Sequence, residues 1–160
     1  LTIEELLSQT PYLCGTSGNS FAMLTFELET VPTPQLIENG NSFCEDEKKN
    51  VWIGTDGAGI RYWNRKQNTY DVYSTTSSAG RKIQSDFVTS IVRDSDNAIW
   101  VAMWKGGVCR IDPKSKAIQN FSIYNQFTKK AEQESWLLFL DSKKTLWLAA
   151  LIIILKITQS

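Results

Sequence analysis

Short runs of alternating apolar and polar residues recur along the chain, and polar turns separate them. Residues 99–104 alternate in this way and carry large apolar side chains on both faces, which predicts a short strand with two buried faces. Gly106 and Gly107 follow, and glycines permit the positive φ of a tight reversal. Further short runs at 87–93, 108–112 and 118–123 predict three more strands.

The same pattern repeats at an interval of about 48 residues. Each unit carries a tryptophan in its second strand, and these are Trp52, Trp100 and Trp147. Six positions before each tryptophan stands an aspartate: Asp46, Asp94 and Asp141. Seven positions after the first two tryptophans stands a glycine: Gly59 and Gly107. A degraded copy at residues 14–18 precedes the first unit, so the chain holds about three and a half units.

Four short antiparallel strands per unit, joined by tight turns, are typical of a β-propeller blade. We therefore expect an all-β fold in which residues 1–160 form a single partial propeller. The expected blades span residues 37–84 and 85–131, with incomplete blades at 1–36 and 132–160. In the last unit residues 151–154 replace the glycines by Leu and Ile, so the sequence does not define its hairpin.

The incomplete blade count has a consequence for what covers the outer sheets. Three and a half blades do not close a ring of seven, and an open stack exposes apolar sheet faces at both ends. The sequence begins with Leu1 and no signal segment follows, so we expect a processed or excised piece of a protein, or a chain whose start is missing. We expect the remaining blades of that protein, or another copy of this chain, to cover the open faces. A compact four-bladed ring is the alternative.

The repeated tryptophans have two interpretations. Both faces of a propeller sheet pack against neighbouring blades, and a large flat side chain fills the wedge between two sheets. An indole can also stack on a ligand. We interpret Trp52, Trp100 and Trp147 as packing residues, and Gly59 and Gly107 as structural residues of the same repeat.

Composition excludes several classes of function. Lys and Arg number 17, as do Asp and Glu, so the net charge is zero and offers no electrostatic footprint for nucleic acid or an anionic membrane. Histidine is absent, which excludes imidazole-dependent catalysis, His-ligated zinc and a phospho-accepting histidine in this chain. The longest apolar run, residues 146–155, is too short for a membrane-spanning helix.

No cofactor or metal is expected. Cys14, Cys44 and Cys109 lie far apart and are odd in number, which argues against a disulfide framework and a zinc site. We interpret them as small buried apolar residues. The acidic stretches 45–47 and 94–97 are interpreted as turn formers rather than calcium ligands, because a calcium loop needs a glycine and a distal glutamate.

The repeated string resembles a known family. Residues 46–62 read Asp, a short turn, Val-Trp-Ile-Gly-Thr, a glycine cluster and a polar–aromatic ending, which closely resembles the two-component regulator propeller repeat. The second copy keeps Asp94 and Trp100 but has Ala102 and Met103 where the family prefers Gly-Thr. The WD-type repeat contains a Gly-His and a terminal Trp-Asp, and this sequence has neither. The kelch repeat places its tryptophan after its glycines, whereas Trp100 precedes Gly106. Both repeats therefore resemble this sequence less closely.

The resemblance implies a function in signalling. Proteins with this repeat are typically bacterial hybrid two-component sensors, in which periplasmic seven-bladed propellers bind a glycan fragment or another small ligand. By that resemblance this chain is a non-catalytic, periplasmic or extracellular sensing segment, and the kinase lies outside it. The alternative is a lectin or polysaccharide-acting enzyme that uses the propeller.

The blade topology predicts a ligand-binding face. Alternate turns of an up-and-down meander lie on the same face of a blade. The turns at 56–58 and 104–106 should therefore share a face with the inter-blade linkers 74–86 and 125–134. Because the loops on this face are longer, we expect the ligand there.

Five residues are the candidates for ligand binding: Asp56, Arg61, Trp104, Lys105 and Arg110. Trp104 beside Lys105 would give an aromatic platform next to a polar donor, which suits a sugar ring. Arg61 and Arg110 are expected near the same loop, where either could bind a ligand carboxylate. The alternatives are a packed loop position for Trp104 and ion pairs with Asp or Glu for the arginines.

Overall fold

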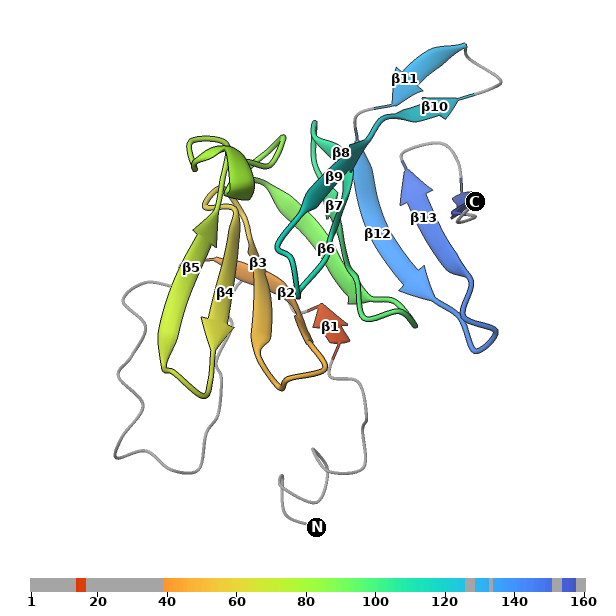
Figure 1. Cartoon of the computed structure of the whole chain (residues 1–160). Coiled ribbons are helices and arrows are strands. Elements are labelled where there is room, and N and C mark those ends of the chain that lie inside the picture. The colour runs from red at the N-terminus through yellow and green to blue at the C-terminus, as the bar shows by residue number, and fades with distance from the viewer. Residues whose placement is uncertain (1–13, 17–38, 126–128, 133, 151–153, 158–160) are drawn as a thin grey trace.

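The computed structural model describes residues 14–16, 39–125, 129–132, 134–150 and 154–157. Three antiparallel sheets follow one another along this part of the chain (Figure 1). The first contains β1 (Cys14–Thr16), β2 (Gly40–Glu45), β3 (Val51–Thr55), β4 (Ile60–Asn64) and β5 (Thr69–Tyr73), in that order. The second contains β6 (Val88–Arg93), β7 (Ile99–Met103), β8 (Gly107–Ile111) and β9 (Ile118–Phe121). The third contains β12 (Ser135–Leu140), β13 (Leu146–Ala150) and β14 (Ile154–Ile157).

Two shorter elements connect the sheets. A 3-10 turn, η1 (Ala79–Arg81), lies in the connection between the first and second sheets. The connection from the second to the third sheet forms a hairpin of β10 (Ile123–Asn125) and β11 (Lys130–Glu132), which projects from the stack of sheets. The polar linker expected at 125–134 is therefore in part a strand.

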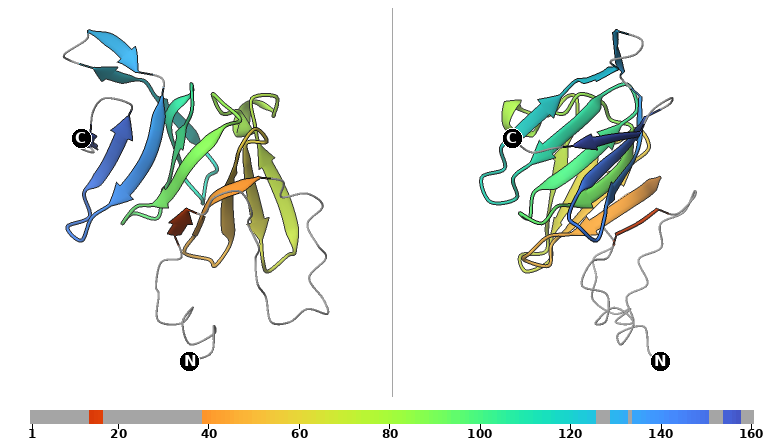
Figure 2. Two further views of the ribbon diagram at one scale, coloured as in Figure 1. Left: turned by 180° about the vertical axis from the view of Figure 1, so that it is seen from behind. Right: turned by 90° about the vertical axis from the view of Figure 1, so that its right-hand side faces the viewer.

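The expected all-β fold of propeller blades is confirmed. The sheets stand face to face with the β6–β9 sheet in the middle, and the first strands β2, β6 and β12 lie nearest one another (Figure 2). Strand order within each sheet follows the chain, as in a propeller blade. β1 pairs with β2 as a fifth strand, and most of the incomplete blade expected at 1–36 lies outside the described residues.

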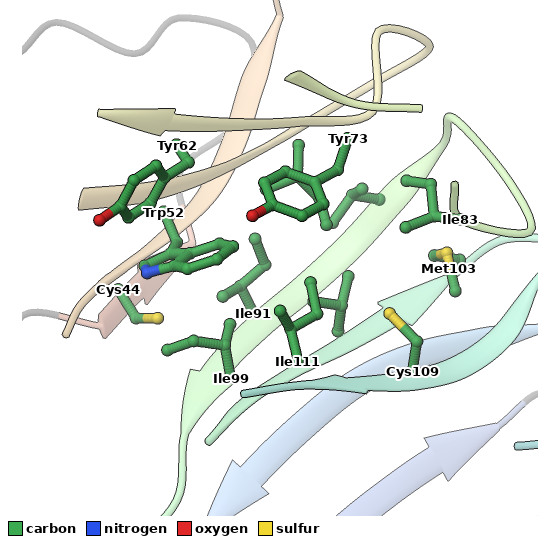
Figure 3. Packing of buried hydrophobic residues seen from close by; sticks show 13 residues of the cluster. Cys44, Trp52, Tyr62, Tyr73, Ile83, Ile91, Ile99, Met103, Cys109 and Ile111 are labelled. Atoms are coloured by element: carbon green, nitrogen blue, oxygen red, sulfur yellow. The ribbon is translucent and has the colours of Figure 1, made fainter. Parts of the chain in front are cut away.

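The first interface between sheets is an aromatic and aliphatic core. Trp52 is fully buried on the face of the first sheet that meets the second, beside Tyr62 at 4.5 Å and Tyr73 at 5.4 Å between ring centroids. Branched and sulfur-containing side chains of the second sheet complete the core, among them Ile91, Ile99, Val101, Met103 and Ile111 (Figure 3). Burial of this apolar surface holds the two sheets together.

The second interface repeats the first. Trp100 lies on the face of the second sheet that meets the third, where it packs in one cluster with Leu138, Leu146 and Leu148. In β13, Leu146 and Leu148 face the second sheet. Trp147 lies between them in sequence and therefore faces away from the second sheet, and it pairs with Phe139 in the register of β12 and β13. Trp52 and Trp100 are thus on the faces turned toward the next sheet, and Trp147 is on the equivalent face of the third sheet.

One aspartate organises the turn before each tryptophan strand. Asp94 Oδ1 accepts the backbone N–H groups of Asp96 and Ala98, both at 2.9 Å, and its Oδ2 accepts the Trp100 indole N–H at 2.7 Å. Asp46 and Asp141 make the corresponding bonds, with indole distances of 3.3 Å to Trp52 and 2.9 Å to Trp147. The acidic stretches 45–47 and 94–97 are therefore turns whose carboxylates fix an indole.

The same hydrogen bonds shift the titration of the third aspartate. Donation by the Trp147 indole, together with the amides of Thr145 and Lys143, lowers the pKa of Asp141. A lowered carboxyl pKa means that the ionised form is favoured in the folded state. Asp141 therefore contributes stability above its ordinary pKa, and this contribution is lost as the pH falls through its lowered value.

Glycine is required at two positions of the repeat. Gly59 has φ +73° and Gly107 has φ +66°, and at each a Cβ atom would collide with the backbone oxygen of the fourth strand, at Tyr73 and Phe121 respectively. The last unit has no glycine there, yet β13 and β14 pair in register from Leu146–Ile157 to Ala149–Ile154. The third hairpin therefore forms, although its turn, 151–153, lies outside the described residues.

The strand before each tryptophan strand has a bulge, and in the first two sheets this bulge forms a hydrogen bond to the next sheet. The register shifts at Asn41, Thr89 and Trp136, the second residue of β2, β6 and β12. Asn41 Nδ2 donates to the Val88 carbonyl and Thr89 Oγ1 donates to the Ser135 carbonyl, each at 2.6 Å. A bulge turns its side chain away from the paired strands of its own sheet. The bulge side chains of Asn41 and Thr89 reach the neighbouring blade in this way.

A lysine crosses the first interface. Lys116, in the turn between β8 and β9, places its ammonium 3.6 Å from the centroid of Tyr62 and 4.9 Å from that of Trp52. Nζ is buried without a hydrogen-bond partner in the described part of the chain, and this burial lowers the pKa of Lys116. The two rings thus stabilise a charge from the facing sheet by cation–π interaction.

We predict that Asp94→Ala destabilises the fold far more than Asp96→Ala two positions away. The first change leaves two turn amides, one of them buried, and the buried Trp100 indole N–H without their acceptor, which costs roughly 2–4 kcal/mol of unfolding free energy. The second removes an exposed carboxylate and should change stability by less than about 0.5 kcal/mol. Urea unfolding of both variants measures the difference, and equal effects would contradict the assigned role of Asp94.

Candidate functional site

The loop after the first tryptophan strand, β3, contacts the start of the second sheet. Asp56 forms a bridge with Phe87, and the N–H groups of Gly57 and Gly59 donate to the Asp86 carbonyl at 3.1 and 2.9 Å. Asp86 in turn accepts both the N–H and the hydroxyl of Thr75, at 2.8 and 2.7 Å. The 56–59 loop and the 74–86 linker therefore lie on one face of the molecule, as the strand order predicts.

An exposed aromatic pair stands on this face. Phe87 and Trp104 meet edge to face, with ring centroids 5.5 Å apart and an interplanar angle of 82°. Phe87 is 43% exposed and Trp104 is partly exposed. The Lys105 ammonium lies 4.2 Å from the Trp104 centroid, so a cation covers one side of the platform.

Three of the five candidate residues lie in this loop region. Asp56 neighbours Phe87 through the bridge, and Trp104 with Lys105 completes the group. The structure adds Phe87, which the sequence did not single out. We call the group formed by Asp56, Phe87, Trp104 and Lys105 the rim cluster.

The equivalent position in the first sheet explains why Phe87 belongs here. The Trp104 N–H donates to the Phe87 carbonyl at 2.9 Å, and the Asp56 N–H donates to the Asn39 carbonyl at 3.0 Å. Phe87 and Asn39 are 48 positions apart, which is the repeat interval. The same backbone frame therefore presents polar side chains in the first blade and aromatic side chains in the second.

The two candidate arginines do not join the rim cluster. Arg110 pairs in register with Trp100, and its Nε lies 4.0 Å from Asp94 Oδ2, at the opposite end of the blade from Trp104. The expectation that Arg110 lies near the same loop is wrong, because β8 runs away from that loop. Arg61 lies within β4 opposite Ile53 and Val72, two residues beyond Gly59.

Arg110 instead lines a surface groove on the opposite face. The groove lies between the turns of the first and second blades, and its charged lining includes Glu47, Lys48, Arg110, Asp112 and Lys114. Asn97 donates to Glu47 across it at 3.2 Å. Backbone N–H groups of residues 114 and 115 donate to Asp112 and lower its pKa. Charges of both signs line this groove, so no ligand charge is selected.

Within the described part of the chain, His, Cys, Asp and Glu do not gather in groups of three or more that could hold a metal ion. The same residues include no helix long and apolar enough to cross a membrane.

The stacked antiparallel sheets, each with a tryptophan hydrogen-bonded to the aspartate six residues before it, define a β-propeller segment. In the comparison with protein families, the model described as two component regulator propeller matches residues 39–57 and 82–105 of this chain. No curated protein matches the sequence.

Solved structures share the fold. The chain is similar to the extracellular domain assigned to the hybrid two-component system BT3049 of B. thetaiotaomicron, with 25% identity and a TM-score of 0.54 over 73% of this chain. It is also similar to the extracellular domain assigned to the one-component system BT4673 of the same organism, with 16% identity and a TM-score of 0.58 over 68% of this chain. The chain spans only 17% and 15% of those two domains.

Proposed function

We propose that this chain is a non-catalytic, ligand-sensing segment of the extracellular propeller of a two-component receptor, and that its ligand is a glycan. The repeat family and the likeness to extracellular domains of such systems support the receptor assignment. The chain contains no histidine, so any phosphate transfer to histidine takes place elsewhere in the receptor.

The single observation that carries the glycan proposal is the rim cluster. Phe87 and Trp104 leave ring surface open on the face where the longer connections lie. A sugar ring presents C–H groups that pack on an aromatic face and hydroxyls that need polar partners. Asp56 offers an acceptor and Lys105 a donor beside those rings, so one site supplies both kinds of contact.

We predict that Trp104→Ala weakens glycan binding by the full extracellular region at least tenfold, which corresponds to about 1.4 kcal/mol. Isothermal titration calorimetry over a panel of oligosaccharides measures this. Lys114→Ala is the control, because Lys114 lines the groove on the opposite face, away from the rim cluster. Unchanged affinity in Trp104→Ala, or no affinity for any member of the panel, would refute the glycan site.

We propose further that another blade of the same protein covers the outer face of the third sheet. Leu137, Phe139 and Ile154 are 47%, 59% and 73% exposed on this face, beside Trp147. In the two preceding sheets the equivalent face, which carries Trp52 or Trp100, is buried by the next blade. The remaining blades of the receptor would complete the third interface in the same way, and a second copy of this chain is the alternative cover.

Sedimentation velocity of the isolated 160-residue chain tests this arrangement. We expect concentration-dependent self-association, because the outer face of the third sheet is apolar and uncovered. Phe139→Glu should reduce it by placing a charge on that face, whereas Tyr124→Glu should leave it unchanged. A monomer that stays stable at all concentrations and does not respond to Phe139→Glu would show that the face needs no cover.

A further inference from the structure

The groove between the first two blades has the size of a small ligand. It lies on the face opposite the rim cluster, and its lining consists of residues 46–48, 96–98, Arg110 and 112–114. Its volume is about 150 Å³. Because a water molecule takes up about 30 Å³ in the liquid, the groove holds about five waters, which suits a small molecule and not an oligosaccharide. The Asn97–Glu47 hydrogen bond joins its two sides.

The aspartate turns of the two blades present opposite charges to this groove. Lys48 and Asp96 are 48 positions apart, so they occupy equivalent positions in the first and the second turn. The backbone N–H of Lys48 donates to Asp46, and that of Asp96 donates to Asp94, each at 2.9 Å. The hydrogen bonds that fix each turn therefore also fix the backbone from which these two side chains extend.

Neither of these charged groups has a partner within the described residues. There the ammonium of Lys48 and the carboxylate of Asp96 form no ion pair and no hydrogen bond, and only their backbone N–H groups are bonded. The neighbouring Lys49, by contrast, pairs with Glu45 at 2.7 Å and does not line the groove. Opposite charges thus line one groove without neutralising each other.

Arg110 adds a second cation to the lining. In the described part of the chain its one ion pair runs from Nε to Asp94 Oδ2 at 4.0 Å, and the side chain is 30% exposed. The same oxygen of Asp94 accepts the Trp100 indole N–H at the shorter distance of 2.7 Å. Since a guanidinium carries five N–H donors, Arg110 retains donors for a further acceptor.

We propose that this groove binds a small zwitterion, such as a free amino acid, whose carboxylate contacts Lys48 and Arg110 and whose ammonium contacts Asp96. A ligand with a single charge is attracted by one set of groups and repelled by the other, whereas a zwitterion is attracted by both. The contacts are open to solvent and screened by salt, so we expect dissociation constants in the millimolar range.

This inference does not rest on the glycan proposal, because the groove and the rim cluster lie on opposite faces of the blades. Its lining residues all belong to the first two blades, which pack against each other within this chain. The groove can therefore be tested in the purified chain. Failure of that test would leave the glycan site untouched, because the glycan site is tested with oligosaccharides.

The test is a titration of the isotope-labelled chain, at neutral pH and constant ionic strength, observed by NMR. The probes are glycine, β-alanine and γ-aminobutyrate, whose two charges stand at increasing separation. We expect saturable shifts of the backbone amides of residues 46–48 and 96–98 with at least one probe, and no shift of the Trp104 indole N–H. Acetate and methylammonium carry one charge each and should bind about threefold more weakly, or worse. No saturable shift with any of the three probes, or equal affinity for acetate, would overturn the proposal.

Matched variants separate the two charges. Lys48→Gln should weaken binding of the zwitterion by about threefold, and Asp96→Asn should do the same while leaving the weaker response to acetate unchanged. Lys49→Gln is the control, because Lys49 is the adjacent lysine and is paired with Glu45 outside the groove. Equal losses in Lys48→Gln and Lys49→Gln, with the fold retained by circular dichroism, would show a general effect of charge and contradict the site.

Discussion

The arrangement of the sheets depends on an aspartate carboxylate that accepts hydrogen bonds from the backbone of its own turn and from an indole at the same time. In each of three turns an aspartate accepts backbone N–H groups through one oxygen and an indole N–H through the other. A buried indole N–H without an acceptor is costly, and an ionised acceptor makes the hydrogen bond stronger than a neutral one. The turn and the tryptophan six residues later are therefore fixed together, and Trp52 and Trp100 are held on the faces that meet the next sheet.

This constraint divides the blade into two ends with different properties. The end with the aspartate turns is the same in all three units, because each turn must present the same two acceptor oxygens. The other end bears no such restriction. There the equivalent loop carries Asp56 in one blade and Trp104 in the next, and the connections differ between a 3-10 turn and the β10–β11 hairpin. Variation at that end leaves the core intact, which is why ligand-binding residues are expected there.

The sequence predicted the parts of the structure that local pattern controls. Alternation, the aspartate–tryptophan spacing and the glycines at 59 and 107 predicted the blade, since strands and turns depend on nearby residues. The end of the blade at which Arg110 lies also follows from pattern: a hairpin centred on the loop before Gly107 pairs Arg110 with Trp100, away from Trp104. The prediction for Arg110 was wrong because closeness to the loop in sequence does not decide at which end of the blade a side chain lies. The strand register decides this.

Other features depend on contacts between distant segments. Phe87 contacts Trp104 only because the chain just before β6 lies beside the loop after β7. The residues next to Phe87 in the sequence do not indicate this contact. The pairing of β1 with β2 joins residues 14–16 to residues 42–44 across the intervening chain. The β10–β11 hairpin is short and polar, so its strands lack the apolar alternation that reveals the others.

The direct test of the account is hydrogen exchange at the six indole N–H groups, followed by NMR. The account predicts protection of Trp52 and Trp100 in the core and, despite the open face around it, measurable protection of Trp147; Trp104 and Trp136, which have no such aspartate, should exchange fast. Asp141→Asn should speed exchange at Trp147 while leaving Trp52 and Trp100 protected. Exchange at Trp147 that is as fast as at Trp104, or that does not respond to Asp141→Asn, would contradict the central role of the aspartate–indole hydrogen bond.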